Sequence, residues 1–317
     1  MTFGFWYLSF MVKIVFFGTP SFILPVLDSL AAPPYEVATV VCAPDKPVGR
    51  KQALTAPPAK LWAQQHDIAV LQPEKLGPEF LHELRKYKAD VGIIAAYGKI
   101  ISKAVLDSFP KGILNVHPSL LPRWRGPSPV QTAIAAGDNE TGVTIMLTDE
   151  KMDHGPILAQ KKRVLFGTET GGKLTEQLFR EGAELLRMVL PQWLRDEISP
   201  HKQEHDKATF SKTVTREDGR LDFTRPAEEL GRFVRAYAPW PGTFFETKET
   251  GRVKVLEAET ITEKPGKKPG TLIRIGQGNF GIVCQRGVFA PKVIQKEGRN
   301  PISANDFAKG REEIFSE

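Results

Sequence analysis

Cysteines and metal-binding patterns are scarce in this chain. Its 317 residues include two cysteines, Cys42 and Cys284. Two cysteines offer no disulfide framework, which fits a reducing compartment. The sequence also lacks CxxC and HExxH patterns, the common signatures of zinc sites. These absences predict a cytoplasmic protein that uses no metal.

Long apolar runs are also missing. The first ten residues, MTFGFWYLSF, are apolar, but they lack the basic start of a signal peptide and continue into a strand-like run. Lys13 interrupts this apolar stretch well short of the about 20 residues that a transmembrane helix needs. We expect residues 1–10 to be a non-native or dispensable extension before Met11, and we expect no membrane partner.

The charge balance is moderately basic. The chain has 43 Lys and Arg against 37 Asp and Glu, giving a net charge of +6 and a pI near 9.2. Residues 206–317 hold 20 of the basic and 16 of the acidic side chains, so most of the surplus lies there. This balance favours an anionic partner. The length allows two domains, each with its own core.

The first half of the sequence alternates strand-like and helix-like patterns. Apolar runs at 12–18, 36–43 and 89–96 alternate with helical patterns at 18–30, 57–66, 77–87 and 103–107. This order predicts an α/β fold with a Rossmann-like parallel sheet. A helix at 129–136, a strand at 141–150 and a long amphipathic helix at 170–196 complete a first domain at 11–197. The GTPSF turn at Gly18 is not GxGxxG, so we expect no dinucleotide site.

The stretch ILNVHPSLLPRWRG, residues 113–126, places polar groups at the end of a buried strand. Asn115 and His117 are two residues apart, so their side chains leave the same face of an extended backbone. The carboxyl ends of parallel strands usually form the ligand crevice. An amide that stabilises an oxyanion beside an imidazole that moves a proton suits acyl transfer. The alternative is a pair of hydrogen-bonded polar caps.

A carboxylate further along the chain is the third candidate catalytic group. Asp153, in the loop KMDHGPIL, would orient His117, fix the tautomer of its ring and favour its charged form. Alternatively, Asp153 before Gly155 is a turn residue with a local hydrogen bond. His154 is a competing acid/base group, but neighbouring side chains point apart in an extended loop, so we rank it below His117.

These motifs together resemble the 10-formyltetrahydrofolate-dependent formyltransferases, especially those that act on charged tRNA. The resemblance rests on Asn-x-His followed by SLLPRWRG, on PSPVQTAI and GVTIMLTDE, and on Asp-x-Gly at 153–155, and it extends from Val12 to about Phe315. It implies 10-formyltetrahydrofolate as the formyl donor and methionine on initiator methionyl-tRNA as the acceptor, for the initiation of translation. It also implies catalytic roles for Asn115, His117 and Asp153, and folate contacts from Ser119, Leu120, Leu121 and Pro122.

Two basic segments are candidate tRNA contacts. The stretch PDKPVGRKQAL, residues 44–54, is either a solvated loop or a basic arm that grips phosphates. The resemblance favours the arm, because related enzymes carry a basic loop here near the tRNA acceptor arm. Guanidinium groups on both sides of Trp124 also suit an anionic substrate. The expected tRNA-binding residues are Lys46, Arg50, Lys51, Arg123 and Arg125.

The last third of the sequence changes character. Residues 198–212 predict a polar linker, in which His201 and His205 are solvent-exposed. Short β runs follow at 219–223, 241–247, 251–260, 270–276, 280–287 and 290–295, which predict a small barrel. The resemblance implies an OB-like tRNA-binding domain at 213–317. We expect Trp240, between two prolines, to be a structural plug, and we expect a monomer.

Two alternatives remain open at this level. The same catalytic set serves other folate-dependent formyltransferases and formyl-folate hydrolases. From a different class, the chain could be a catalytically inactive RNA-binding protein. Folate-dependent turnover distinguishes these possibilities, whereas tRNA binding alone does not.

Overall fold

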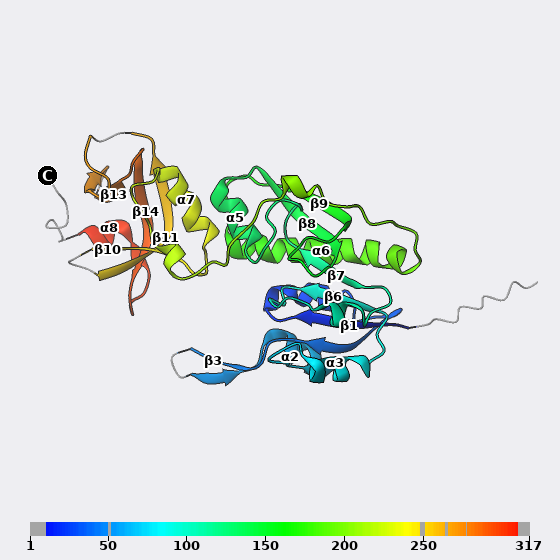
Figure 1. Ribbon diagram of the computed structural model, residues 1–317. Helices are drawn as coiled ribbons and strands as arrows, with labels where there is room; N and C mark the ends of the chain where they lie inside the picture. Colours follow the sequence, from blue (N-terminus) through cyan, green and yellow to red (C-terminus); the bar gives the residue numbers. More distant parts are fainter. Residues whose placement is uncertain (1–10, 50–51, 248–250, 264–265, 277, 310–317) are drawn as a thin grey trace, which may run out of the picture. The chain divides into compact units, whose positions relative to one another are not determined.

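A computed structural model describes residues 11–49, 52–247, 251–263, 266–276 and 278–309 (Figure 1). The chain divides into two units. The first comprises the residues up to Pro127, Gly142–Arg163 and Thr175–Phe210; the second comprises Ser128–Thr141, Val164–Leu174 and the residues from Ser211 onward. The extension expected at residues 1–10 lies outside the described ranges. Within those ranges, no helix combines the length and apolar composition needed to cross a membrane.

A seven-stranded sheet forms the centre of the first unit, in the order β5-β2-β1-β6-β7-β8-β9. The strands from β5 to β7 pair in parallel, and β8 runs antiparallel to β7. The parallel part confirms the predicted Rossmann-like fold. The sequence did not predict β5 or β9. The strands are β1 (Val12–Gly18), β2 (Tyr35–Val41), β5 (Ala69–Leu71), β6 (Val91–Ala95), β7 (Ile113–His117), β8 (Glu140–Leu147) and β9 (Ile157–Val164).

Helices cover both faces of this sheet because alternate strand residues are buried on opposite sides. Ile14 and Phe16 belong to one apolar cluster with residues of α1, α2 and α6. Val15 and Phe17 belong to another with residues of α3 and α4. The helices are α1 (Leu24–Asp28), α2 (Pro58–Gln65), α3 (Pro78–Arg85), α4 (Lys103–Leu106) and α6 (Gly171–Leu194).

Helix α6 approaches β7 closely, and this contact shows which side of the sheet each β7 side chain faces. A Cβ at Gly182 would lie 2.5 Å from Cγ1 of Val116. Val116 therefore faces α6, and its neighbours Asn115 and His117 face the other side of the sheet. Ile113, on the same side as these two, belongs to a buried cluster with Phe17.

The second unit contains a six-stranded antiparallel sheet, in the order β10-β11-β14-β13-β12, with β15 paired to β14. Figure 1 shows β14 between β11 and β13, and α7 contacts β11 and β14. The core includes Phe280, Phe289 and Phe307. This small β domain confirms the second part of the predicted fold class. The elements are α5 (Pro129–Ala136), α7 (Ala227–Ala236), β10 (Thr243–Thr247), β11 (Gly251–Ile261), β12 (Leu272–Ile275), β13 (Asn279–Val283), β14 (Val288–Lys296), β15 (Ile302–Ser303) and α8 (Ala304–Ala308).

Two local predictions in this unit are wrong. Residues 219–223 do not form a strand: Arg220 makes an isolated bridge with Phe244, and the Asp222 carboxylate accepts hydrogen bonds from the backbone and hydroxyl of Thr224. Such a local turn competes with strand pairing. Trp240 is not a buried plug, because 55% of its surface is exposed.

Candidate active site

The end of β7 and the loop after β8 bring three predicted residues together. The Asn115 amide Nδ2 donates to Asp153 Oδ1 at 3.2 Å, and His117 Nδ1 lies 3.5 Å from the same oxygen. The other carboxylate oxygen, Oδ2, accepts the backbone N–H of Gly126 at 2.7 Å. His117 is 4% exposed. Asp153 therefore lies at the centre of the cluster, with contacts to β7 and to the loop that follows it.

The hydrogen bonds of His117 determine which ring nitrogen is basic. Nε2 lies 3.1 Å from the carbonyl oxygen of Trp124. A carbonyl only accepts hydrogen bonds, so Nε2 carries the hydrogen in the neutral ring. The tautomer is therefore set by a backbone carbonyl, and Nδ1, facing Asp153, is free to take a proton. The sequence predicted instead that Asp153 sets the tautomer.

The loop of Asp153 depends on a close backbone approach. Asp153 has a φ of 48°, which costs a non-glycine residue conformational energy. Two residues later, a Cβ at Gly155 would lie 2.0 Å from the carbonyl oxygen of Leu147. The spacing Asp-x-Gly thus has a steric cause: without a glycine at 155 the loop could not fold back against the end of β8.

The predicted folate-binding loop, residues 119–122, is held by hydrogen bonds from buried side chains. Ser119 is 1% exposed and donates its hydroxyl to the carbonyl of Arg123 at 2.7 Å. The Thr144 hydroxyl donates to the Ser119 carbonyl and accepts from the Leu121 backbone N–H. Leu121 is also buried, whereas Leu120 and Pro122 are half-buried. Leu120 and Pro122 are therefore the side chains of this loop that keep some exposed surface.

Comparison with known proteins identifies the family of this chain. The family profile "Formyl transferase" matches residues 12–190, and "Formyl transferase, C-terminal domain" matches residues 213–312. The methionyl-tRNA formyltransferase of Chloroflexus aurantiacus is 44% identical over 305 residues, with 94% of this chain and 97% of the relative covered. The chain belongs to the methionyl-tRNA formyltransferase family. That of Halorhodospira halophila is 41% identical over 299 residues, with 94% and 96% covered.

Solved structures show the same fold at low sequence identity. An N-formyltransferase from Helicobacter canadensis, in complex with folinic acid and dTDP-3-aminofucose, is 16% identical with a TM-score of 0.65, over 89% of this chain and 99% of its own. HypX from Aquifex aeolicus, in complex with tetrahydrofolic acid, is 16% identical with a TM-score of 0.59, over 94% of this chain and 47% of its own. The chain thus shares its fold with an N-formyltransferase and with HypX.

Arg123 and Arg125 lie in different environments. Arg123 is exposed, and its guanidinium lies 4.4 Å from the ring centroid of Trp124. Arg125 is 4% exposed and donates to the Gln203 carboxamide oxygen and to His205 Nδ1, at 2.7 and 2.8 Å from Nη2. Burial lowers the pKa of Arg125, and nearby Asp153 and Asp149 oppose that shift. This placement does not fit the direct tRNA contact expected of Arg125; it suits a role inside the formyltransferase site.

Sequence reasoning overlooked Gln203. It falls in the segment predicted as a linker, but it is 5% exposed and its amide donates to the carbonyls of Asp153 and Gly155. A neutral polar side chain in a polar segment carries no signal of burial. The one available hint is that the motif residues Asp153 and Gly155 require hydrogen-bond partners for their backbone.

His154 has a different partner set from His117. Its Nδ1 lies 2.6 Å from Asp149 Oδ2, and its ring stacks on that of His205 with centroids 4.0 Å apart. His205 is exposed, as predicted, although its ring has these contacts. Partial desolvation, followed by the nearby His154 and Arg125, lowers the pKa of His205.

The basic segment 44–54 forms a two-stranded antiparallel hairpin from β3 (Lys46–Val48) and β4 (Ala53–Thr55). Lys46 is exposed at its start. Arg50 and Lys51 lie outside the described residues.

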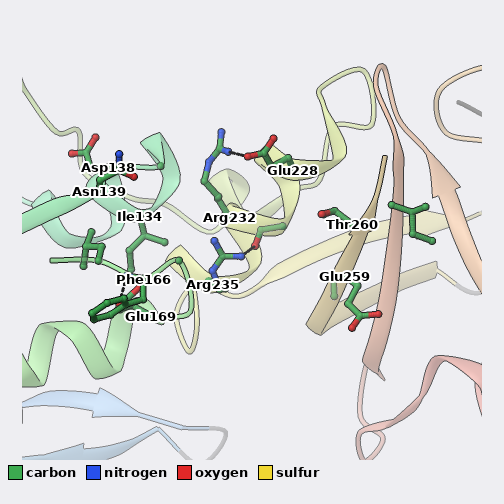
Figure 2. Close-up of a pocket in the computed structure, with 16 residues that line it drawn as sticks. Ile134, Asp138, Asn139, Phe166, Glu169, Glu228, Arg232, Arg235, Glu259 and Thr260 are labelled. Carbon is green, nitrogen blue, oxygen red and sulfur yellow. Dashed lines mark hydrogen bonds and ion pairs between the residues drawn. The ribbon is translucent and has the colours of Figure 1, made fainter. Parts of the chain in front are cut away.

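A cavity of about 640 Å³ lies within the second unit (Figure 2). Figure 2 shows Arg232 pointing toward Glu228, its ion-pair partner at 3.3 Å. The lining contains none of the predicted site residues. Its four carboxylates outnumber its two guanidinium groups, so an anion is disfavoured there. Its charged lining residues are Asp138, Glu169, Glu228, Arg232, Arg235 and Glu259.

Proposed function

We propose that this protein transfers the formyl group of 10-formyltetrahydrofolate to the α-amino group of methionine on initiator methionyl-tRNA, as a cytoplasmic monomer in translation initiation. The observation that carries the proposal is the contact of Asn115, His117 and Asp153 at the end of β7. The relatives at 44% and 41% identity, which are methionyl-tRNA formyltransferases, support this acceptor over a sugar or a small nucleotide.

The reaction forms one carbon–nitrogen bond and breaks another. The amine nitrogen attacks the formyl carbon, the carbonyl oxygen gains negative charge, and the bond to N10 of the folate then breaks. One hydrogen of the Asn115 amide is donated to Asp153, so the second is available for the oxyanion. A donor of this kind is worth about 3 to 4 kcal/mol in the transition state.

His117 is the proton carrier in this scheme. Its Nδ1 accepts the proton that the attacking amine loses, while Nε2 stays bonded to the Trp124 carbonyl. Asp153 stabilises the imidazolium that forms, as the carboxylate does in other acid/base sites. The same proton then protonates N10 as the folate leaves, so the charges balance at the end of the cycle.

The folate donor is expected to contact the loop at 119–122, chiefly through Leu120, Pro122 and the backbone. The tRNA is expected to contact Lys46, Arg50 and Lys51 of the basic segment 44–54, exposed Arg123, and the domain at 213–317. Lys46→Ala should lower the salt dependence of tRNA binding by about one phosphate contact, a slope change near 0.7 to 0.9. A tRNA affinity that does not respond to ionic strength would contradict the basic arm.

The test is transfer of labelled formyl from 10-formyltetrahydrofolate to methionine on initiator tRNA, by the intact protein and by His117→Ala. We expect transfer by the intact protein and loss of transfer in the variant. Consumption of formyl-folate without transfer would favour a hydrolase, and tRNA binding without consumption would favour an inactive RNA-binding protein.

A further inference from the structure

One side chain outside the three proposed catalytic residues contacts both loops that form the site. Gln203 uses every polar group of its carboxamide: Nε2 donates to the carbonyls of Asp153 at 2.9 Å and Gly155 at 2.7 Å, and Oε1 accepts from Arg125 Nε at 3.1 Å and Nη2 at 2.7 Å. One of these carbonyls belongs to Asp153, the residue whose carboxylate contacts Asn115 and His117. We propose that Gln203 is a positioning residue of the formyl-transfer site, an inference that rests on the proposed function.

Gln203 holds the loop that carries Asp153. Asp153 has a φ of 48°, a conformation that persists only where the surroundings enforce it. The carbonyls on both sides of His154 are each bonded to the same amide group. That clamp fixes the backbone from Asp153 to Gly155, and so fixes the direction of the Asp153 carboxylate.

Gln203 also holds the facing loop, residues 122–126. Arg125 is bound at its guanidinium by Gln203, and the next residue, Gly126, donates its backbone N–H to Asp153 Oδ2 at 2.7 Å. A charged donor that binds one acceptor through two N–H groups forms a strong, directional contact. Gln203 therefore places both the carboxylate and the N–H that orients it.

The chain that follows Gln203 is also bonded to the loop at 122–126. Thr209, six residues later, accepts the Trp124 backbone N–H with its hydroxyl at 2.9 Å and the Arg125 backbone N–H with its carbonyl at 2.9 Å. The segment 203–209 is therefore a strap, bonded to the Asp153 loop at one end and to the loop at 122–126 at the other. Trp124, which the strap holds, carries the carbonyl that binds His117.

A glutamine is required for this set of contacts. Gln203→Leu removes two donors and one acceptor at a site 5% exposed, leaving the partner groups without them. Gln203→Glu keeps the acceptor for Arg125 but removes both donors to the loop. A displacement of the order of 1 Å at a reacting group lowers turnover by up to about 100-fold.

The test compares Gln203→Leu with the intact enzyme in the formyl-transfer assay, both alone and combined with Asp153→Ala. When Asp153 is present, we expect Gln203→Leu to lower kcat by about 10- to 100-fold, with KM for folate and tRNA nearly unchanged. In the Asp153→Ala background we expect less than about a 2-fold effect, because a residue that acts through Asp153 has little left to position. An equal fall in both backgrounds would overturn the proposal.

A direct readout uses the amide of Gly126, which is bonded to the Asp153 carboxylate. Its hydrogen exchange should accelerate in Gln203→Leu. The matched control is Thr39→Ala, which removes another buried side chain that donates to a backbone carbonyl, that of Ala69 at 2.9 Å. The control should leave both kcat and Gly126 exchange unchanged. An unaltered Gly126 amide in Gln203→Leu would overturn the proposal, whereas an intact enzyme without formyl transfer would overturn the proposed function itself.

Discussion

The segment 113–126 and the strap at 203–209 line the same site but differ in how they contribute. The first carries Asn115 and His117, whose side chains have the chemistry for acyl transfer. The second carries Gln203 and Thr209, which bind backbone groups of the site loops. Reactive residues in an apolar strand stand out in a sequence, whereas residues that hold a loop in place look like any polar surface. The comparison suggests that the first group should affect turnover most and the second should affect it by smaller, graded amounts.

The largest effect is expected at the oxyanion donor. Asn115→Ala should lower kcat by about 100- to 1000-fold, because it removes a donor to the charge that develops in the transition state. Affinity for tRNA, measured by filter binding, should stay within a factor of about two, since ground-state contacts are unchanged. Unchanged turnover would show that Asn115 does not stabilise the oxyanion. The two segments would then not differ in their effect on turnover in the way expected.

The next effect is steric and acts through the Asp153 loop. Gly155→Ala places a Cβ 2.0 Å from the Leu147 carbonyl oxygen, so the loop must move. We expect kcat to fall by up to about 100-fold, with a measurable loss in Tm. Gly77→Ala is the matched control, because a Cβ there meets nothing within 4 Å. Equal activity in the two variants would mean that the loop position does not matter.

A smaller effect is expected at the far end of the strap. Thr209→Val removes the acceptor of the Trp124 N–H and should lower kcat by about 2- to 10-fold, the value of one hydrogen bond. The control Thr132→Val removes a comparable hydroxyl, bonded to the Ser128 carbonyl in the second unit. If both variants had the kcat of the intact enzyme, Thr209 would have no role in positioning the site, and Gln203 would be the one strap residue that does.

The smallest effect is a pH dependence. The pKa of His205 is lowered in the folded protein, so the unfolded chain protonates first as the pH falls below the ordinary value of about 6.5. The stability contributed by the neutral ring is therefore present above pH 6.5 and is lost as the pH falls toward the lower, folded pKa. The groups that affect this titration are His154, Arg125, Asp149 and Lys151.

His205→Asn keeps an acceptor for Arg125 but does not titrate. Its Tm should fall less than that of the intact protein between about pH 8 and pH 5.5. Parallel pH profiles of Tm would show that the imidazole stack has no role in stability.

The sequence was sufficient for the parts of the molecule that depend on periodicity. The buried strands at 12–18 and 113–117 are mostly apolar, and α5 and α6 have helical spacing, so these elements were predicted close to their bounds. The segment 219–223 failed because an apolar alternation too short to dominate yields to a local turn at Asp222.

The helix cap at Ser303 and the buried pair of Arg125 and Gln203 differ in how much of each the sequence can indicate. Ser303 caps helix α8, since its hydroxyl accepts the Asp306 backbone N–H, a capping pattern that is visible in the sequence. Arg125 and Gln203 had no such signal, because burial of a guanidinium or a carboxamide depends on segments about 80 residues apart meeting in space. Long-range polar pairing of this kind has no local pattern.

The position of the strap along the chain bears on how the enzyme can be divided. The profile of the amino-terminal family domain ends at residue 190, which includes Asn115, His117 and Asp153 but excludes Gln203 and Thr209. A fragment cut at that boundary, or the same three residues transplanted onto another α/β scaffold, would contain every proposed catalytic side chain and none of the strap. Protein engineering on this fold should therefore take the segment up to Phe210 as the smallest unit that can preserve the site.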